Sequence, residues 1–149
     1  MNNDISVMIN NKKLNIRVGI IFKYEDKVLV EVPKYNFYNS VVPGGRIKIG
    51  EYSIDAIKRE IKEEMGFELL DSKLGFVKTL EEMFTFNNID YHEIFFIYKY
   101  NVDYDDYNLL LKIKDNQDNA NSYYKFITKE EFNEYNLLPL EIRDIINEK

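Results

Sequence analysis

Apolar residues recur at helical spacing in one segment near the middle of the chain. Four of them are separated by three or four residues, which places them on one side of an α-helix: Ile54, Ile57, Ile61 and Met65. Ser53 is expected to cap the start of this helix, because its hydroxyl oxygen can accept a backbone N–H. Gly66 is expected to end this helix, because glycine readily adopts the left-handed conformation that follows many helix C-termini. The pattern predicts a helix over residues 53–65 with its apolar face turned to a core.

Shorter apolar or alternating runs on both sides of this helix predict β-strands. The ranges expected to be strands are 4–9, 14–24, 28–32, 40–42, 67–80, 91–101 and 123–127. The segment at 91–101, YHEIFFIYKYN, is the most pronounced, because aromatic and β-branched residues favour strands. Short polar turns join several of these runs and favour hairpins, so the sheet cannot be entirely parallel.

The last third of the chain adds shorter elements. Residues 103–108 are predicted to form an acidic loop. Thr128 and Glu131 have the spacing of a capping box at the start of a short helix, and residues 140–147 are predicted to form a terminal helix. We therefore expect residues 1–149 to form a single α/β domain with a mixed sheet between helices.

Acidic side chains gather on the face of the 53–65 helix opposite its apolar residues. Glu60, Glu63 and Glu64 stand at positions i, i+3 and i+4 and project together. Each like-charge pair at this spacing costs about 0.2–0.5 kcal/mol in an isolated helix. A hard divalent cation would turn that repulsion into ligation. The alternative is a solvated acidic face balanced by neighbouring lysines, and spacing alone leaves both interpretations open.

A longer pattern surrounds these glutamates. Gly45 is followed by five residues, Glu51, seven residues and then the segment REIKEEMGF from Arg59 to Phe67. This pattern resembles the Nudix box, the signature of the Nudix hydrolases. The resemblance implies an α/β/α sandwich around a mixed sheet. It also implies divalent-metal-dependent hydrolysis of a nucleoside diphosphate linked to another group, by attack of water on phosphorus.

The resemblance implies roles for individual residues. Glu60, Glu63 and Glu64, with the carbonyl of Gly44, would hold Mg²⁺; Mn²⁺ accepts the same oxygen ligands. Arg59 and Glu51 would form a bidentate pair that steadies the box. Members of the family differ in which carboxylate is the general base, so the base is left open here.

Four residues outside the helix are further candidates. Arg17 and Arg46 could meet substrate phosphate, and Tyr38, which precedes the double glycine, could stack on a base. Glu93 shares a largely apolar strand face, where a carboxylate is costly unless it is paired or bound to metal. We therefore predict that Glu93 faces the active site as a catalytic residue.

The net charge, the apolar runs and the cysteine content of the chain limit the kinds of binding partner to expect. The net charge of −6 argues against broad nucleic-acid binding, and no apolar run approaches the length of a membrane span. The absence of cysteine fits a cytoplasmic location. We expect a small nucleotide substrate, and aromatic strand edges would permit a homodimer. The alternative function is a catalytically silent Nudix-fold sensor or regulator that binds a nucleotide. Such modules typically lose box carboxylates, whereas this chain retains them all.

Overall fold

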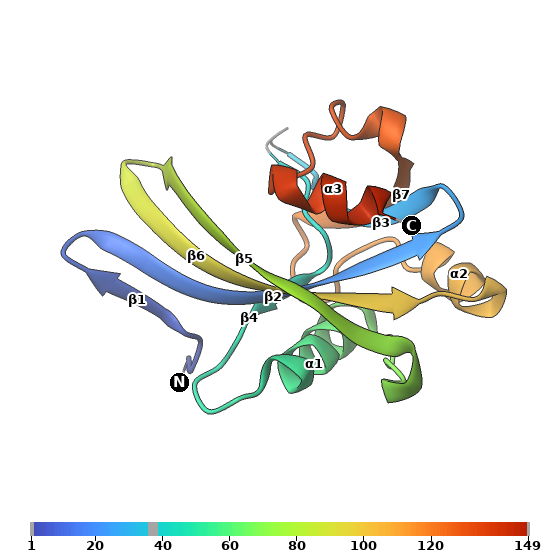
Figure 1. The fold of residues 1–149 in the computed structure, drawn as a ribbon, viewed down its shortest axis with the longest axis horizontal. Helices are drawn as coiled ribbons and strands as arrows, with labels where there is room; N and C mark the ends of the chain where they lie inside the picture. The colour runs from blue at the N-terminus through green and yellow to red at the C-terminus, as the bar shows by residue number, and fades with distance from the viewer. Residues whose placement is uncertain (1, 36–38, 149) are drawn as a thin grey trace.

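The computed structural model describes residues 2–35 and 39–148. Within these residues a seven-stranded mixed sheet lies between helices (Figure 1). The strands are β1 (Ser6–Ile9), β2 (Lys12–Tyr24), β3 (Lys27–Pro33), β4 (Gly44–Arg46), β5 (Leu74–Phe86), β6 (Ile89–Asn101) and β7 (Ser122–Thr128). The helices are α1 (Ser53–Met65), α2 (Tyr104–Leu111) and α3 (Leu140–Asn147), with short 3₁₀ turns η1 (Asp71–Lys73) and η2 (Lys129–Glu131).

Strand β2 organises the sheet. One of its edges runs parallel to β6, from Lys12 opposite Asp90 to Lys23 opposite Asn101. Its other edge pairs antiparallel with β1, then β4, then β3 as the strand advances. Strand β5 extends the sheet beyond β6, and β7 extends it beyond β3. The predicted mixed sheet is confirmed, and β4 reaches it only through β2.

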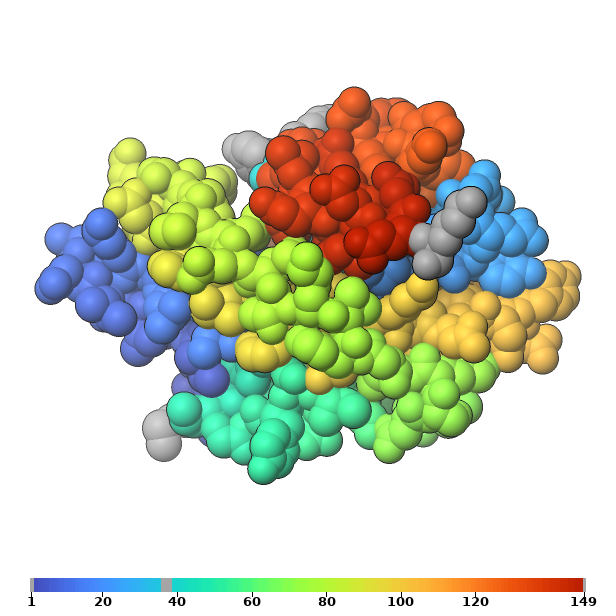
Figure 2. Space-filling view, in the orientation of Figure 1, coloured from blue at the N-terminus to red at the C-terminus, as the bar shows by residue number. Residues whose placement is uncertain are grey.

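Two asparagine pairs make the hairpin turns at one end of the sheet. Asn10 and Asn11 join β1 to β2, and Asn87 and Asn88 join β5 to β6; all four have positive φ angles. Asparagine tolerates the left-handed region better than most residues, which suits two-residue hairpin turns. Because β2 pairs with β6, the two hairpins project side by side (Figures 1 and 2).

The two faces of the sheet carry separate apolar cores. Helix α1 covers the lower face in Figure 1, where Ile57 and Ile61 pack with Val18, Ile20 and Phe22 of β2. Helix α3 covers the upper face, where its apolar side pairs with the opposite side of β2 and β6: Ile21, Phe95, Ile97, Ile142, Ile145 and Ile146. Successive strand residues alternate between these faces, so residue parity in β2 and β6 decides which helix a side chain meets.

The predicted cap of helix α1 is wrong by one residue. Tyr52 occupies the N-cap position and makes no side-chain cap hydrogen bond. Ser53 is the first helical residue, and its hydroxyl lies 2.6 Å from the hydroxyl of Tyr98. Ile54, expected on the apolar face, is 37% exposed. The Ser53 hydroxyl, which the local pattern assigned to capping the start of the helix, instead contacts Tyr98 of β6.

Three other predicted boundaries also change. Residues 67–70 are not strand; η1 follows them, and β5 runs from Leu74 to Phe86. The expected acidic loop at 103–108 is mostly helix α2, because Asp103 and Asp106 form a capping box. The expected strand at 40–42 makes only isolated bridges, and pairing with β2 begins at Gly44. Among the described residues, no helix is long and apolar enough to cross a membrane.

Candidate active site

Arg59 is the centre of a network that ties helix α1 to the loop before it. Its Nε lies 2.7 Å from Glu51 Oε2, and its Nη2 lies 3.0 Å from Glu51 Oε1, which makes the pair bidentate. Nη2 also donates to the Arg46 carbonyl, and Nη1 donates to Glu60 and Glu63. The hydrogen bonds from Arg59 hold the pKa of Glu51 below its ordinary value. The guanidinium therefore fixes three carboxylates relative to one another.

Gly45 leaves the space that the Glu60 carboxylate occupies. A Cβ atom at Gly45 would lie 2.5 Å from Glu60 Oε2. Glu60 is only 8% exposed, although it is charged and belongs to the acidic side of the helix. A glycine before the helix thus allows the backbone of β4 to pass directly over a buried carboxylate.

Glu60 and Glu64 form a coupled carboxyl pair. Each is within hydrogen-bonding reach of the other. Burial raises the pKa of Glu64, and the charges of Glu31 and Glu60 raise it further; burial also raises the pKa of Glu60, against the effect of Arg59. The raised pKa of Glu64 favours its protonated form, so the pair keeps a proton near neutral pH when no metal is bound. A bound divalent cation could take the place of that proton.

The donor set fits a hard metal ion in its chemistry, but among the described residues no three acidic, histidine or cysteine side chains are arranged around a common point that could hold an ion. Glu60 and Glu64 supply oxygens in a half-buried place. The Glu63 side chain is 43% exposed at the rim and is held by Arg59 at 3.2 Å. Gly44 begins β4 beside this cluster. Carboxylate oxygens of this kind are the ligands of Mg²⁺, Mn²⁺ and Ca²⁺.

The structure adds three residues that the sequence analysis missed. Glu31 of β3 and Tyr124 of β7 are cross-strand partners on the α1 face. The Tyr124 hydroxyl lies 3.5 Å from Glu64 Oε2, and Glu31 accepts hydrogen bonds from Ser122 and Asn116. Asp118 contributes a further negative charge near Glu64, from a loop whose Gln117 N–H donates to the Glu64 carbonyl. Of these three residues, only Glu31 could have been noticed in the sequence, because it is a charged residue within the apolar run KVLVEVP.

Arg17 and Glu93 lie on the opposite face of the sheet. Glu93 is 4% exposed and accepts hydrogen bonds from Asn15 Nδ2 at 2.8 Å and Arg17 Nη1 at 3.3 Å. Its strand neighbours Phe95 and Ile97 belong to the α3 core. The structure therefore does not bring Glu93 to the box glutamates, and Arg17 is paired with a carboxylate. We predicted that Glu93 lies among the catalytic groups, and the structure corrects this. Alternate residues of β6 face opposite sides of the sheet, and Glu93 shares the α3 side with Phe95 and Ile97.

A cavity of about 270 Å³ opens beside this pair. Its polar lining includes Arg17, Glu82 and Glu93, and its apolar walls include Val41, Phe84 and Pro139. The segment that leads to Gly45 begins in the wall of this cavity, at Asn39 and Val41. Arg46 lies opposite Arg17 in the β2–β4 register. Tyr38, the predicted base-stacking residue, lies outside the described residues.

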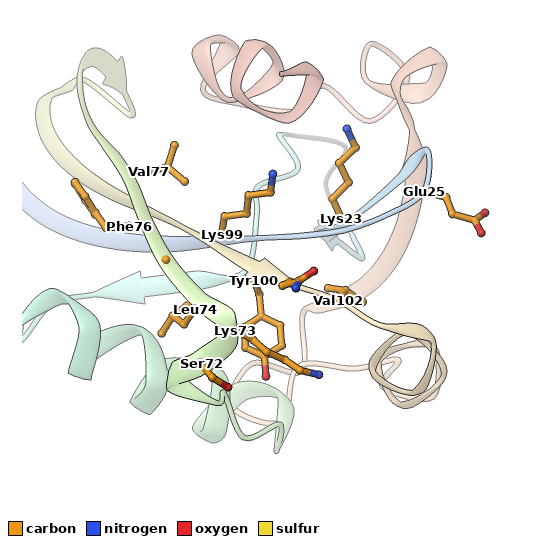
Figure 3. Close-up of a pocket in the computed structure, with 12 residues that line it drawn as sticks. Lys23, Glu25, Ser72, Lys73, Leu74, Phe76, Val77, Lys99, Tyr100 and Val102 are labelled. Carbon is orange, nitrogen blue, oxygen red and sulfur yellow. The ribbon is translucent and has the colours of Figure 1, made fainter. Parts of the chain in front are cut away.

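Another cavity, of about 640 Å³, lies at the far end of β5 and β6 (Figure 3). Figure 3 shows Lys23 and Lys99 on the side of α3 and Ser72 on the other side of the strands. Two of the lysines that line this cavity already have partners. Lys73 forms ion pairs with Asp103 and Asp106, and Lys23 donates a hydrogen bond to the Ile146 carbonyl. Its lining contains none of the box residues, so the candidate active site is the cluster beneath Gly45.

Comparison with known proteins agrees with the architecture and the box. The family model described as NUDIX domain matches residues 13–146, and the chain therefore belongs to the Nudix family. A search of curated proteins found no match.

Solved structures of Nudix proteins share the fold at low identity. A MutT protein from Bacillus halodurans is 18% identical with a TM-score of 0.62, over 90% of this chain and 80% of that one. A NUDIX hydrolase from Nitrosomonas europaea is 20% identical with a TM-score of 0.60, over 89% and 85%. An Ap4A hydrolase from C. elegans is 15% identical with a TM-score of 0.57, over 89% and 91%. The predicted Nudix sandwich with a mixed sheet is confirmed.

Proposed function

We propose that this protein is a divalent-metal-dependent Nudix hydrolase. It would cleave a pyrophosphate bond in a nucleoside diphosphate linked to another group, such as a (d)NTP, an oxidised nucleotide or ADP-ribose. The observation that carries the proposal is the position of Glu60 and Glu64, since Glu60 lies beneath Gly45, accepts a hydrogen bond from Arg59 and is within hydrogen-bonding reach of Glu64. A pair of this kind is costly for folding and useful for binding a cation.

The box residues would divide the work. Glu60, Glu63 and Glu64, with the Gly44 carbonyl, would hold Mg²⁺ or Mn²⁺. The ion would neutralise phosphate charge and lower the pKa of an attacking water. Arg59 and Glu51 keep the carboxylates in place, as their bidentate hydrogen bonds support. The general base stays open, because Glu64 is assigned to the metal ion here and its raised pKa favours the protonated form when no metal is bound.

The cavity beside Arg17 would receive the part of the substrate beyond the pyrophosphate. Arg46 stands opposite Arg17 in the register, and its carbonyl accepts a hydrogen bond from Arg59, so it is our candidate for contact with phosphate. Arg17 and Glu93 would line the substrate site rather than perform chemistry. Residues 1–149 would form one Nudix domain. The cytoplasmic location, the homodimer and the role of Tyr38 stay predictions.

One observation favours a second candidate, a Nudix-fold sensor that binds a nucleotide without cleaving it. Arg59 already neutralises Glu60 and Glu63, so two expected metal ligands are engaged by a cation of the protein itself. An ion would have to draw Glu63 away from Arg59 before the described carboxylates could surround it.

The deciding experiment measures phosphate and pyrophosphate release from a nucleotide panel. The panel holds (d)NTPs, oxidised dNTPs, ADP-ribose, NADH and dinucleoside polyphosphates, each with Mg²⁺, with Mn²⁺ and with excess EDTA. Turnover that EDTA abolishes supports the hydrolase. Thermal stabilisation by a nucleotide without turnover supports the sensor, and metal-independent turnover contradicts the proposed site.

A further inference from the structure

Glu82 stands in a position that the folded chain alone does not explain. It is directly opposite Glu93 in the β5–β6 register, on the α3 face. Like charges directly opposite one another destabilise a strand pair. Among the described residues, Glu82 makes no hydrogen bond or ion pair, whereas Glu93 has both Asn15 and Arg17. The charge of Arg17 offsets part of the repulsion on Glu82, but no hydrogen bond or ion pair among the described residues satisfies its carboxylate.

The surroundings of Glu82 increase this imbalance. Two carboxylates, Glu82 and Glu93, face one guanidinium, Arg17, in the lining of the 270 Å³ cavity. Burial raises the pKa of Glu82, the charges of Glu93 and Glu141 raise it further, and the charge of Arg17 offsets part of this shift. A further phosphate would meet a local excess of negative charge here. A group that brings N–H donors would satisfy the free carboxylate oxygens.

The cavity has the size and polarity for one flat ring. Its volume is near the lower end of the range for small-molecule pockets. Apolar walls from Val41, Leu138 and Pro139 flank the polar groups, and Phe84 adds an aromatic side chain. Apolar and aromatic walls with a few convergent polar groups are how proteins hold a single nucleobase.

We propose that Glu82 determines the specificity of this cavity by selecting a ring whose edge carries two adjacent N–H donors beside an acceptor, as guanine does. The Glu82 carboxylate would accept from N1–H and the 2-amino group, and Arg17 would donate to O6. Hypoxanthine lacks the 2-amino donor. Xanthine places an acceptor against the carboxylate, and adenine presents its N1 acceptor there. The inference rests on the proposed function, because it assigns the base of that substrate.

The test measures binding separately from hydrolysis. Nucleoside monophosphates have no pyrophosphate bond, so dissociation constants of GMP, IMP, XMP and AMP are measured by calorimetry on the full chain. We expect GMP to bind about tenfold more tightly than IMP, the effect of one hydrogen bond to a charged group. XMP and AMP are expected to bind more weakly than IMP.

Two variants separate Glu82 from its neighbours. Glu82→Gln removes one of the two acceptor oxygens, and the preference for GMP over IMP is expected to fall to about twofold or less. Glu81→Gln is the matched control, because Glu81 is exposed and pairs with His92 rather than lining the cavity. It should keep the full preference. Both variants are compared with the wild type by circular dichroism and melting temperature.

Three outcomes overturn the inference: equal binding of GMP and IMP by the wild type, an undiminished preference in Glu82→Gln, or no binding of any monophosphate. Failure of the proposed function looks different. In that case the guanine preference is present for binding, but GTP is not hydrolysed with any metal. Conversely, metal-dependent hydrolysis of all bases at equal rates supports the hydrolase and contradicts the role of Glu82.

Discussion

Arg59 and Arg17 each hold a buried glutamate, but on opposite faces of the same sheet. The partners of Arg59 are Glu51, Glu60 and Glu63, all within eight residues of it. Arg17 binds Glu93, which is 76 residues away. The box network is therefore built from one helix and its preceding loop, while the cavity network needs β2 and β6 to pair.

The two networks also differ in how fully they are satisfied. One arginine bridges three carboxylates in the box, and the remaining Glu64 has a raised pKa that favours its protonated form. In the cavity, Arg17 serves Glu93 and leaves Glu82 without a partner among the described residues. The first arrangement suits a cation that replaces a proton. The second suits a neutral ring that supplies hydrogen-bond donors. The charge on each face thus suits a different group: a metal ion at the box, and the base of the substrate in the cavity.

The largest expected effect is on the box. Glu64→Gln should lower turnover by at least about a hundredfold, because a metal-ion contribution of several kcal/mol corresponds to that factor or more. Melting temperature should be retained or raised, since the change removes one member of a repelling pair. Glu68→Gln is the control, because Glu68 is exposed and its one ion pair among the described residues is with Lys62. Equal turnover in Glu64→Gln and wild type would remove Glu64 from the site.

A steric change at Gly45 tests the same face without removing a carboxylate. Gly45→Ala places a methyl group against Glu60 at 2.5 Å, so the carboxylate must move. We expect about a tenfold loss of turnover, in the range for changes that misplace a metal ligand, together with weaker dependence on Mg²⁺. Gly75→Ala is the matched control, since its Cβ would meet nothing within 4 Å. Similar losses in both variants would show a general effect on folding instead.

On the cavity face, we expect a substitution of Arg17 to lower the stability of the folded chain. Arg17→Gln leaves the buried carboxylate of Glu93 with Asn15 alone, and the free energy of unfolding should fall by about 1–3 kcal/mol. Urea unfolding followed by circular dichroism measures this change. Arg46→Gln, on the strand opposite, has no such buried partner among the described residues and should change stability by less than about 0.5 kcal/mol. A smaller effect at Arg17 than at Arg46 would contradict the importance of the Arg17–Glu93 pair.

The smallest expected effect is the pH dependence of stability without metal. The pKa of Glu64 is raised in the folded state, so the folded chain binds that proton more tightly than the unfolded chain. This contribution is present below the unfolded pKa and is lost as pH rises toward the folded pKa. Glu51, with its lowered pKa, contributes stability that is lost only as pH falls below the ordinary glutamate pKa, so its contribution is constant over the pH range tested.

Thermal unfolding in EDTA at pH values of about 6 and 8 measures how much the protonation of Glu64 contributes to stability. The wild type should lose more stability between these values than Glu64→Gln, and Mg²⁺ should stabilise the wild type more at the higher pH. If Mg²⁺ raises the melting temperatures of wild type and variant equally, the ion binds elsewhere.

Much of the box could be predicted because its interactions are local. Helix α1 was expected over the residues it occupies, and the i, i+3 and i+4 spacing of the glutamates needs only helical geometry. The terminal helix α3 and the strand at β6 follow in the same way from periodicity. Errors occurred where a tertiary partner competed, as when Tyr98 took the Ser53 hydroxyl.

The sequence by itself determined the family, the helix that carries the carboxylates and the arginine that holds them, because these depend on residues close together along the chain. Tertiary structure alone decided that Glu93 faces α3, that Glu31 and Tyr124 stand next to Glu64, and that Glu82 lies opposite Glu93. The physical reason is strand register. A shift of one residue turns a side chain to the other face of a sheet, and only the assembled strands fix which groups meet.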